Sequence, residues 1–229
     1  MEKKLDLKDI VLIGRTFNEY YKMFNVISIS KNDKILDVAS GVSSFCAEAN
    51  ALGYDATASD RIYCFLAEDI EKKCAKDLET TMKEMAEVKD LFKWKFFKNI
   101  EELEKQRKKA YKTFIADFKK PVKVAYVNTE YPKNSFKDKQ FTIALISHFL
   151  FLYDEFLDYE FHKQTIKEII KITSEEIRIF PIVNLKGKRS QFVDKLMKDK
   201  EFASNKIKIM KVDYEFVKGG NEMLIIKSQ

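Results

Sequence analysis

The sequence predicts an α/β protein with a mostly parallel, seven-stranded sheet, helices on both faces and an antiparallel last strand. The first observation is an apolar run, residues 34–38, that contains Asp37 and passes through small residues into a helical segment. The second is a strand-like run from residue 55 that leads to another acid, Asp60. Strand, small-residue turn, helix, strand and acid together form the unit with which such sheets build a nucleotide site.

Turn and cap signals delimit the first elements. Residues 7–29 have a helical pattern rich in aromatic side chains, and an Asn-Asp turn separates them from the strand at 34–38. A helix is expected over residues 44–52, because Gly53 is a good C-cap. The second strand is expected over residues 55–58.

The alternation of strands and helices then stops. Residues 62–120 are helical in character, and Pro121 ends them. This stretch is far longer than a usual connection between strands, so it predicts two or three inserted helices, with a break near residues 95–99. We therefore expect a core formed by residues 1–61 and 121–229, and a helical insertion, residues 62–120, that acts as a lid or recognises the substrate.

After Pro121 the alternation returns and supplies the remaining elements. Short β-branched runs predict strands, and an apolar periodicity of 3.6 residues predicts helices. The last two strands flank a Gly-Gly turn and should form an antiparallel hairpin at the edge of the sheet. The expected elements are strands at 122–127, 141–146 and 176–180, helices at 158–173 and 190–200, and the strand pair at 206–212 and 222–226.

Composition excludes several classes of protein. The chain has 229 residues, of which 45% are hydrophobic, and 19 Phe, enough for a substantial core. No apolar run is long enough to span a membrane, and the charged N-terminus lacks the apolar segment of a secretion signal. Three cysteines without a CxxC pair indicate reduced thiols, and two histidines are too few for a His-rich metal centre. We expect a cytoplasmic protein without a metal site.

Three motifs resemble those of the class I S-adenosylmethionine (SAM)-dependent methyltransferases, which have a Rossmann-like fold. ILDVASGVSSF is similar to their first motif, YDATASD to their ribose-binding second motif, and FKDKQFTIALISHF to the turn that leads into strand four. The C-terminal hairpin resembles the reversed last strand pair of that fold. The first motif departs from the usual Asp-x-Gly-x-Gly-x-Gly, because Gly41 alone remains, with Ala39 and Ser43 at the other two positions. A dinucleotide dehydrogenase is a poorer match, because it would have Gly-x-Gly-x-x-Gly after the first strand.

The resemblance implies SAM as cofactor and S-adenosylhomocysteine (SAH) as product, and it assigns roles along the carboxyl edge of the sheet. Asp37 would face the amino end of the cofactor, the turn at residues 39–41 would approach it, and Asp60 would accept the ribose hydroxyls. His148 is a candidate general base, with a strand-end hydrogen bond as the alternative. The implied cofactor-binding residues are Asp37, Ala39, Ser40, Gly41, Asp60, Arg61, Asn128 or Glu130 beside the adenine, Ser147, Arg15 at the methionine carboxylate, and Tyr20 packed beside it.

The insertion carries the clue to the substrate. Between residues 83 and 123, 13 Lys and Arg oppose seven acids, and aromatic side chains are interleaved with them. Such a pattern can bind single-stranded nucleic acid, but it is also typical of a helical lid with apolar residues inside and Lys outside. We favour the lid because acids are mixed in, and therefore expect methyl transfer by direct displacement to a small molecule. The alternatives are an RNA methyltransferase and a catalytically silent SAM-binding module.

Overall fold

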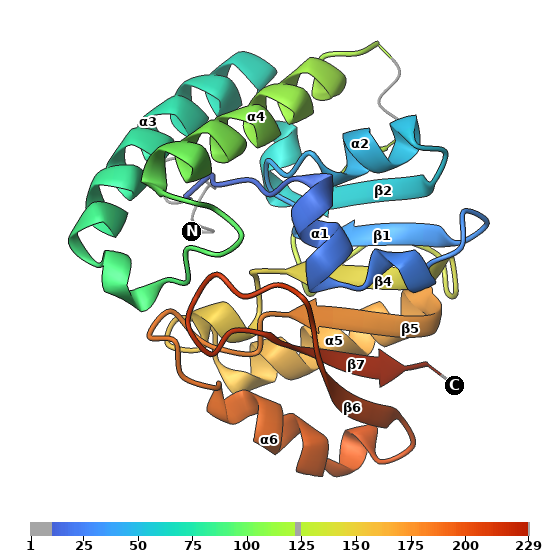
Figure 1. Ribbon diagram of the computed structural model, residues 1–229. Coiled ribbons are helices and arrows are strands. Elements are labelled where there is room, and N and C mark those ends of the chain that lie inside the picture. Colours follow the sequence, from blue (N-terminus) through green and yellow to red (C-terminus); the bar gives the residue numbers. More distant parts are fainter. Residues whose placement is uncertain (1–10, 122–124, 229) are drawn as a thin grey trace, which may run out of the picture.

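The computed structural model describes residues 11–121 and 125–228 and contains a seven-stranded sheet in the order β3-β2-β1-β4-β5-β7-β6 (Figure 1). Strand β7 is antiparallel to both of its neighbours, whereas β3, β2, β1, β4 and β5 pair in parallel. The predicted fold class is therefore confirmed. The strands are β1 (Lys34–Val38), β2 (Asp55–Asp60), β3 (Tyr126–Asn128), β4 (Phe141–Ser147), β5 (Thr173–Phe180), β6 (Lys206–Lys211) and β7 (Glu222–Lys227).

The central strands are buried on both faces, and alternate side chains enter different cores. Ile35 of β1 lies in a core shared with the N-terminal and inserted helices, whereas Leu36 lies in a core on the opposite face. Helices α1 (Phe17–Met23) and α2 (Phe45–Ala51) cover the first face. Helices α5 (Tyr159–Ile172) and α6 (Gln191–Lys198) cover the second.

The inserted segment forms two long antiparallel helices, α3 (Ala67–Glu87) and α4 (Ile100–Phe118), beyond the carboxyl edge of the parallel strands (Figure 1). Helix α4 begins after Asn99, whose side chain accepts a hydrogen bond from the Glu102 amide, so the helical pattern is interrupted where we predicted it. The buried faces of both helices belong to the same core as α1 and α2. The division of the chain into a core and an insertion at residues 62–120 stays a prediction.

Most element limits differ from the predicted ones by only a few residues. Strand β2 extends to Asp60, and β5 begins at Thr173 rather than at residue 176. Part of the strand predicted at 122–127 lies outside the described residues, and β3 is found at Tyr126–Asn128. Strands β6 and β7 pair as predicted, through a connection longer than a tight hairpin.

Within the described part of residues 7–29, the prediction of a helix is confirmed only at α1. Residues 11–16 are not helical, and α1 is only seven residues long. Gly14 explains the difference, because a Cβ there would lie 2.2 Å from the carbonyl oxygen of Val42. The segment before α1 is thus pressed against the turn after β1. The Leu12 amide also donates to Asp77 of α3 at 2.8 Å.

A buried ion pair joins three distant segments at this edge. Glu19 of α1 accepts hydrogen bonds from Arg107 of α4 at 2.6 and 2.8 Å and from the Tyr214 hydroxyl at 2.9 Å. Arg107 also donates to the Gly14 carbonyl at 3.2 Å, and the Thr16 amide donates to Glu19 at 2.9 Å. We call Glu19, Arg107 and Tyr214 the Glu19 hub. It ties the start of the chain and the insertion to the connection between β6 and β7. Among the described residues, no helix is long and apolar enough to cross a lipid bilayer.

Arg107→Met should strongly destabilise the protein, because it leaves the Glu19 carboxylate buried without its cation. We expect a loss of about 3–5 kcal/mol in the free energy of unfolding, measured by urea denaturation. Lys108→Met is the matched control, because Lys108 is exposed on the same helix and forms no ion pair within the described residues. Equal stability of the two variants would contradict a structural role for the hub.

Candidate functional site

Asp37 lies at the carboxyl edge of β1, where Tyr20 of α1 reaches it. The Tyr20 hydroxyl donates to Oδ1 at 3.0 Å, and the Ser40 hydroxyl donates to Oδ2 at 2.5 Å. The structure thus brings three predicted site residues together. Burial raises the pKa of Asp37 to about 7, although both hydrogen bonds oppose the shift. Burial also raises the pKa of Tyr20 well above its ordinary value, so its hydroxyl stays a donor.

The turn after β1 has two residues in the left-handed region of backbone conformation. Gly41 has φ of +58°, and a Cβ there would meet nothing within 4 Å, so the outer side of the turn is open. Ala39 has φ of +50°, a conformation that costs a residue with a Cβ about 1 kcal/mol. Ala39 therefore adopts a left-handed conformation that favours glycine, the residue that the usual first motif has at this position.

Asp60 ends β2 and holds the same turn. Its Oδ2 accepts from the Gly41 amide at 2.8 Å, and its Oδ1 accepts from the Ile62 amide at 3.0 Å. Each carboxylate oxygen has two acceptor sites, so each retains one for a ligand hydroxyl. Burial raises the pKa of Asp60 despite these hydrogen bonds.

Tyr63 is a functional candidate that the sequence analysis missed. It follows β2, and its hydroxyl donates to the Gly41 carbonyl at 2.9 Å. Its ring packs against Phe114 and Phe118 of α4 and against Tyr126 of β3, with ring centroids 5.4–5.8 Å apart. Only the packing of the insertion reveals this role, because Tyr63 belongs to none of the recognised motifs.

The residues expected near an adenine ring are more exposed. Asn128 ends β3 directly opposite Asp60 in the strand register. Arg61 forms an ion pair with Glu130 at 3.6 Å, and both side chains are largely solvated. Of the two candidates for the adenine contact, Asn128 therefore lies opposite Asp60, whereas Glu130 forms an ion pair with Arg61.

Ser147 and His148 lie at the end of β4. The Ser147 hydroxyl is 2.9 Å from His148 Nδ1, and the His148 amide donates to the Phe180 carbonyl at 2.7 Å. Burial, followed by the charges of Arg15 and Arg107, lowers the pKa of His148 well below its ordinary value. The imidazole is therefore neutral at pH 7, as a proton acceptor must be. The other histidine, His162, is buried within α5.

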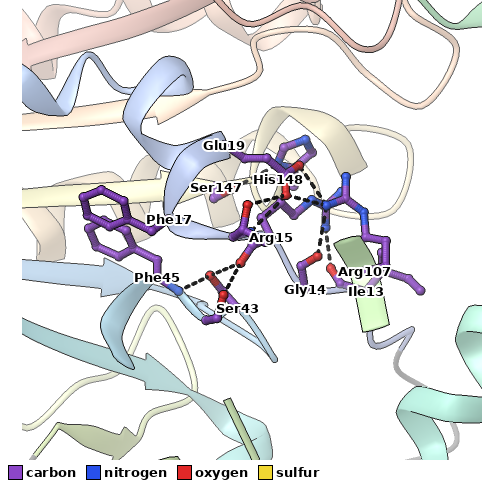
Figure 2. A network of polar contacts seen from close by, with 12 residues as sticks. Ile13, Gly14, Arg15, Phe17, Glu19, Ser43, Phe45, Arg107, Ser147 and His148 are labelled. Carbon is purple, nitrogen blue, oxygen red and sulfur yellow. Dashed lines mark hydrogen bonds and ion pairs between the residues drawn. The ribbon is translucent and has the colours of Figure 1, made fainter. Parts of the chain in front are cut away.

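Arg15 lies beside this pair and beside the Glu19 hub (Figure 2). Its Nη1 donates to the Ile13 carbonyl at 2.6 Å, whereas its Nε is buried and has no hydrogen-bond partner. Burial and the nearby Arg107 lower the pKa of Arg15. Two guanidinium groups thus face one carboxylate here, and Glu19 is already bound by Arg107. Arg15 remains a half-buried cation able to bind an anion.

The sequence analysis missed the Glu19 hub. Arg107 was counted with the basic residues of the insertion, yet it is buried in an ion pair. The spacing of Thr16 and Glu19 is that of a capping box, a signal that could have marked Glu19 as structural. No sequence signal points to Tyr214 as the third member.

The basic and aromatic residues of the insertion are mostly engaged within the protein. Phe97, Tyr111 and Phe114 are buried in the core. Seven of the 13 basic residues form ion pairs within the described part of the chain, with partners on α2, α3, α4 and elsewhere. They are Lys83, Lys93, Arg107, Lys109, Lys112, Lys119 and Lys120.

Comparison of the sequence with known proteins shows the family to which the chain belongs. The chain is 54% identical over 224 residues to the uncharacterized protein MJ0045 of Methanocaldococcus jannaschii, covering 97% of this chain and 98% of that protein. The chain belongs to the MJ0045 family. No protein-family model matches it.

A solved methyltransferase domain shares the fold. The methyltransferase domain of bacterial CtHen1-CN is 10% identical, has a TM-score of 0.50, and covers 92% of this chain and 99% of its own. A putative SAM-dependent methyltransferase of Methanococcus maripaludis is 13% identical, has a TM-score of 0.46, and covers 93% of this chain and 87% of its own. The MJ0045 family member described here therefore has the Rossmann-like fold of the class I SAM-dependent methyltransferases. The role of each predicted site residue stays a prediction.

Tyr63→Phe should loosen the turn, because it removes the hydrogen bond to the Gly41 carbonyl without changing the aromatic packing. We expect the free energy of unfolding to fall by about 1 kcal/mol, measured by chemical denaturation. Tyr111→Phe is the control, because Tyr111 is a buried tyrosine of α4 for which the structure shows no hydroxyl hydrogen bond. A Tyr63→Phe variant as stable as Tyr111→Phe would show that the hydrogen bond from Tyr63 to the Gly41 carbonyl contributes nothing to stability.

Proposed function

We propose that the protein is a SAM-dependent methyltransferase. The observation that carries this proposal is the convergence of Asp37, the Gly41 turn and Asp60 at the carboxyl edge of β1 and β2, in a sheet that shares the class I fold. In open α/β sheets, ligands bind outside the carboxyl ends of the strands, where the strand order reverses. That reversal lies between β1 and β4 in this sheet.

The residues at this edge fit an adenosyl cofactor. The open side of Gly41 lets a ligand approach the backbone, and each oxygen of Asp60 keeps an acceptor site for a ribose hydroxyl. Asp37 offers a carboxylate to a positively charged amino end, and the unpartnered Nε of Arg15 offers a donor to a carboxylate. Ala39, Ser40, Tyr20, Arg61, Asn128 and Ser147 complete the proposed cofactor site.

When bound, the cofactor would supply an electrophilic methyl group for direct displacement. The main work of the protein would then be to position the acceptor and to exclude water. His148 is unprotonated at neutral pH, and its contact with Ser147 orients the ring. It could take the proton that the nucleophile of the acceptor loses, and we propose this as its role.

The acceptor that we favour is a small molecule. The aromatic rings that would have to stack on bases are largely packed in the interior, and many of the insertion's cations are paired. These contacts support the interpretation of the insertion as a lid over the site. An RNA acceptor and a silent cofactor-binding module remain the alternatives to be separated by experiment.

Asp60→Ala should weaken SAM binding, because it removes both acceptor oxygens from the expected ribose site. We expect a loss of about 10- to 100-fold in affinity, the range for charged hydrogen bonds, measured by calorimetric titration with SAM and SAH. Asp55→Ala is the matched control, because Asp55 is an exposed acid at the other end of β2. Wild-type protein that is folded but binds neither ligand would overturn the proposed function.

Cofactor binding should depend on pH through Asp37, whose pKa is about 7. The carboxyl is protonated at pH 5.5 and largely ionised at pH 7.5, and the ionised form attracts the positively charged cofactor. We therefore expect SAM affinity to rise roughly tenfold over that range. The contribution of Asp37 to the stability of the free protein should fall as pH rises from about 4 to about 7, because its carboxyl binds more protons there in the folded state than in the unfolded state. Asp37→Asn should weaken the pH dependence of both SAM affinity and stability. A pH dependence that is unchanged in this variant would show that another group causes it.

A further inference from the structure

Ser43 stands where the usual first motif has its third glycine, yet the backbone does not require a glycine there. Unlike Ala39 and Gly41, Ser43 lies outside the left-handed region of backbone conformation, so a residue with a Cβ fits without backbone strain. Its side chain is buried. The serine therefore adds a buried hydroxyl group to the turn after β1.

That hydroxyl both donates and accepts a hydrogen bond, and it joins the turn to the segment before α1. It donates to the Arg15 carbonyl at 3.0 Å and accepts from the Phe45 amide at 3.1 Å (Figure 2). The Ser44 amide donates to the same Arg15 carbonyl at 3.0 Å. Arg15 is thus attached to the turn through its own backbone.

The residues on either side of Arg15 are held by the Glu19 hub. The Gly14 carbonyl accepts from Arg107 at 3.2 Å, and the Thr16 amide donates to Glu19 at 2.9 Å. Both peptide groups that flank Arg15 are therefore fixed. The hydrogen bonds to the Arg15 carbonyl are the part of this support that comes from the turn of the proposed cofactor site.

The guanidinium group held in this way is a half-buried cation without a counter-ion. Within the described part of the chain Arg15 forms no ion pair, its Nη1 donates to the Ile13 carbonyl, and its Nε is buried without a hydrogen-bond partner. The neighbouring charges do not compensate it, because Arg107 neutralises Glu19 and His148 is neutral at pH 7. A buried cation is stabilised by an anion that pairs with it, so this arrangement suits a carboxylate ligand.

We propose that Ser43 is a positioning residue, which fixes Arg15 so that its guanidinium group binds the carboxylate of the cofactor. This inference rests on the proposed methyltransferase function, because the carboxylate is that of the methionine part of SAM. Ser43 acts through Arg15 rather than by contact with the cofactor. A glycine at this position has no hydroxyl and could not make the interaction.

A second route from Ser43 to the cofactor leads through Tyr20. The Ser43 hydroxyl also interacts with the Tyr20 hydroxyl, which donates to Asp37. Asp37 is expected to face the amino group of the cofactor, whereas Arg15 is expected to bind the carboxylate. Decarboxylated SAM separates the two routes, because it keeps the amino group, the sulfonium and the adenosyl group and lacks only the carboxylate.

The test is calorimetric titration of wild-type protein and of Ser43→Ala with SAM and with decarboxylated SAM. We expect wild type to bind SAM at least about tenfold more tightly than decarboxylated SAM, the effect of a charge-assisted hydrogen bond. Ser43→Ala should weaken SAM binding about fivefold, the effect of one neutral hydrogen bond, and change the affinity for decarboxylated SAM by less than about twofold. Ser43→Gly, which restores the usual residue of the motif, should weaken SAM binding at least as much.

Ser190→Ala is the matched control. Ser190 is also a buried serine at the start of a helix, and its hydroxyl accepts from the amide two residues further on, that of Phe192, at 3.3 Å. It lies at α6 and makes no contact with Arg15. Ser190→Ala should be destabilised in urea denaturation, as Ser43→Ala is, yet keep wild-type affinity for both ligands. An equal loss of SAM affinity in Ser190→Ala would trace the effect to stability and overturn the inference.

Arg15→Met shows whether Ser43 acts through Arg15. This variant should weaken SAM binding at least about tenfold. Ser43→Ala added to it should cause no further loss, because two residues that act as one unit are not additive. A further loss in the double variant, equal weakening of both ligands by Ser43→Ala, or unchanged SAM affinity in Ser43→Ala would overturn the inference.

The results for wild type separate this inference from the proposed function. Wild-type protein that binds SAM and decarboxylated SAM with equal affinity overturns the role of Arg15, and with it that of Ser43, and leaves the proposed function standing. Folded wild-type protein that binds neither SAM nor SAH overturns the proposed function itself.

Discussion

The buried carboxylate of Glu19 is the constraint on which the arrangement at the carboxyl edge of the parallel strands depends. A charge in the interior is tolerated only when it is paired and fully hydrogen-bonded, and Glu19 achieves this with Arg107, Tyr214 and the Thr16 amide. Burial, the largest single effect, raises its pKa, but the charge and hydrogen bonds of Arg107, the Thr16 amide and the charge of Arg15 together hold the pKa of Glu19 below its ordinary value. The partners come from the insertion and from the C-terminal connection. Satisfying one charge therefore requires three distant segments to dock together.

This docking makes the inserted helices part of the edge at which the proposed site lies. Arg107 also bonds the Gly14 carbonyl, and Asp77 bonds the Leu12 amide, so both long helices hold the segment that contains Arg15. Arg15 is thereby fixed with its Nε unpartnered inside the protein.

Local patterns in the sequence were enough to predict the sheet, because strands such as β1 and β4 are continuous apolar runs with polar ends. The order of the motifs implies that β1 and β2 are parallel, so their carboxyl ends lie at one edge. This explains why Asp60 contacts the turn after β1. The N-terminal helix was overpredicted because its aromatic periodicity says nothing of the close approach of Gly14 to Val42. The Glu19 hub could not be predicted, since Glu19 and Arg107 are 88 positions apart and each looks locally like an ordinary helix-surface charge.

The strained turn after β1 is held by contacts from β2 and from the inserted segment. Ala39 takes a left-handed conformation that disfavours the turn by about 1 kcal/mol, a strain that persists only where surrounding contacts determine the backbone. At Gly41 the amide donates to Asp60 and the carbonyl accepts from Tyr63, so the turn is held on both sides. Each hydrogen bond contributes on the order of 1 kcal/mol, which is enough to offset the strain. The Tyr63 ring packs on Phe114 and Phe118, so α4 helps to hold the turn in its left-handed conformation. A turn with glycines at these positions would adopt that conformation without such support.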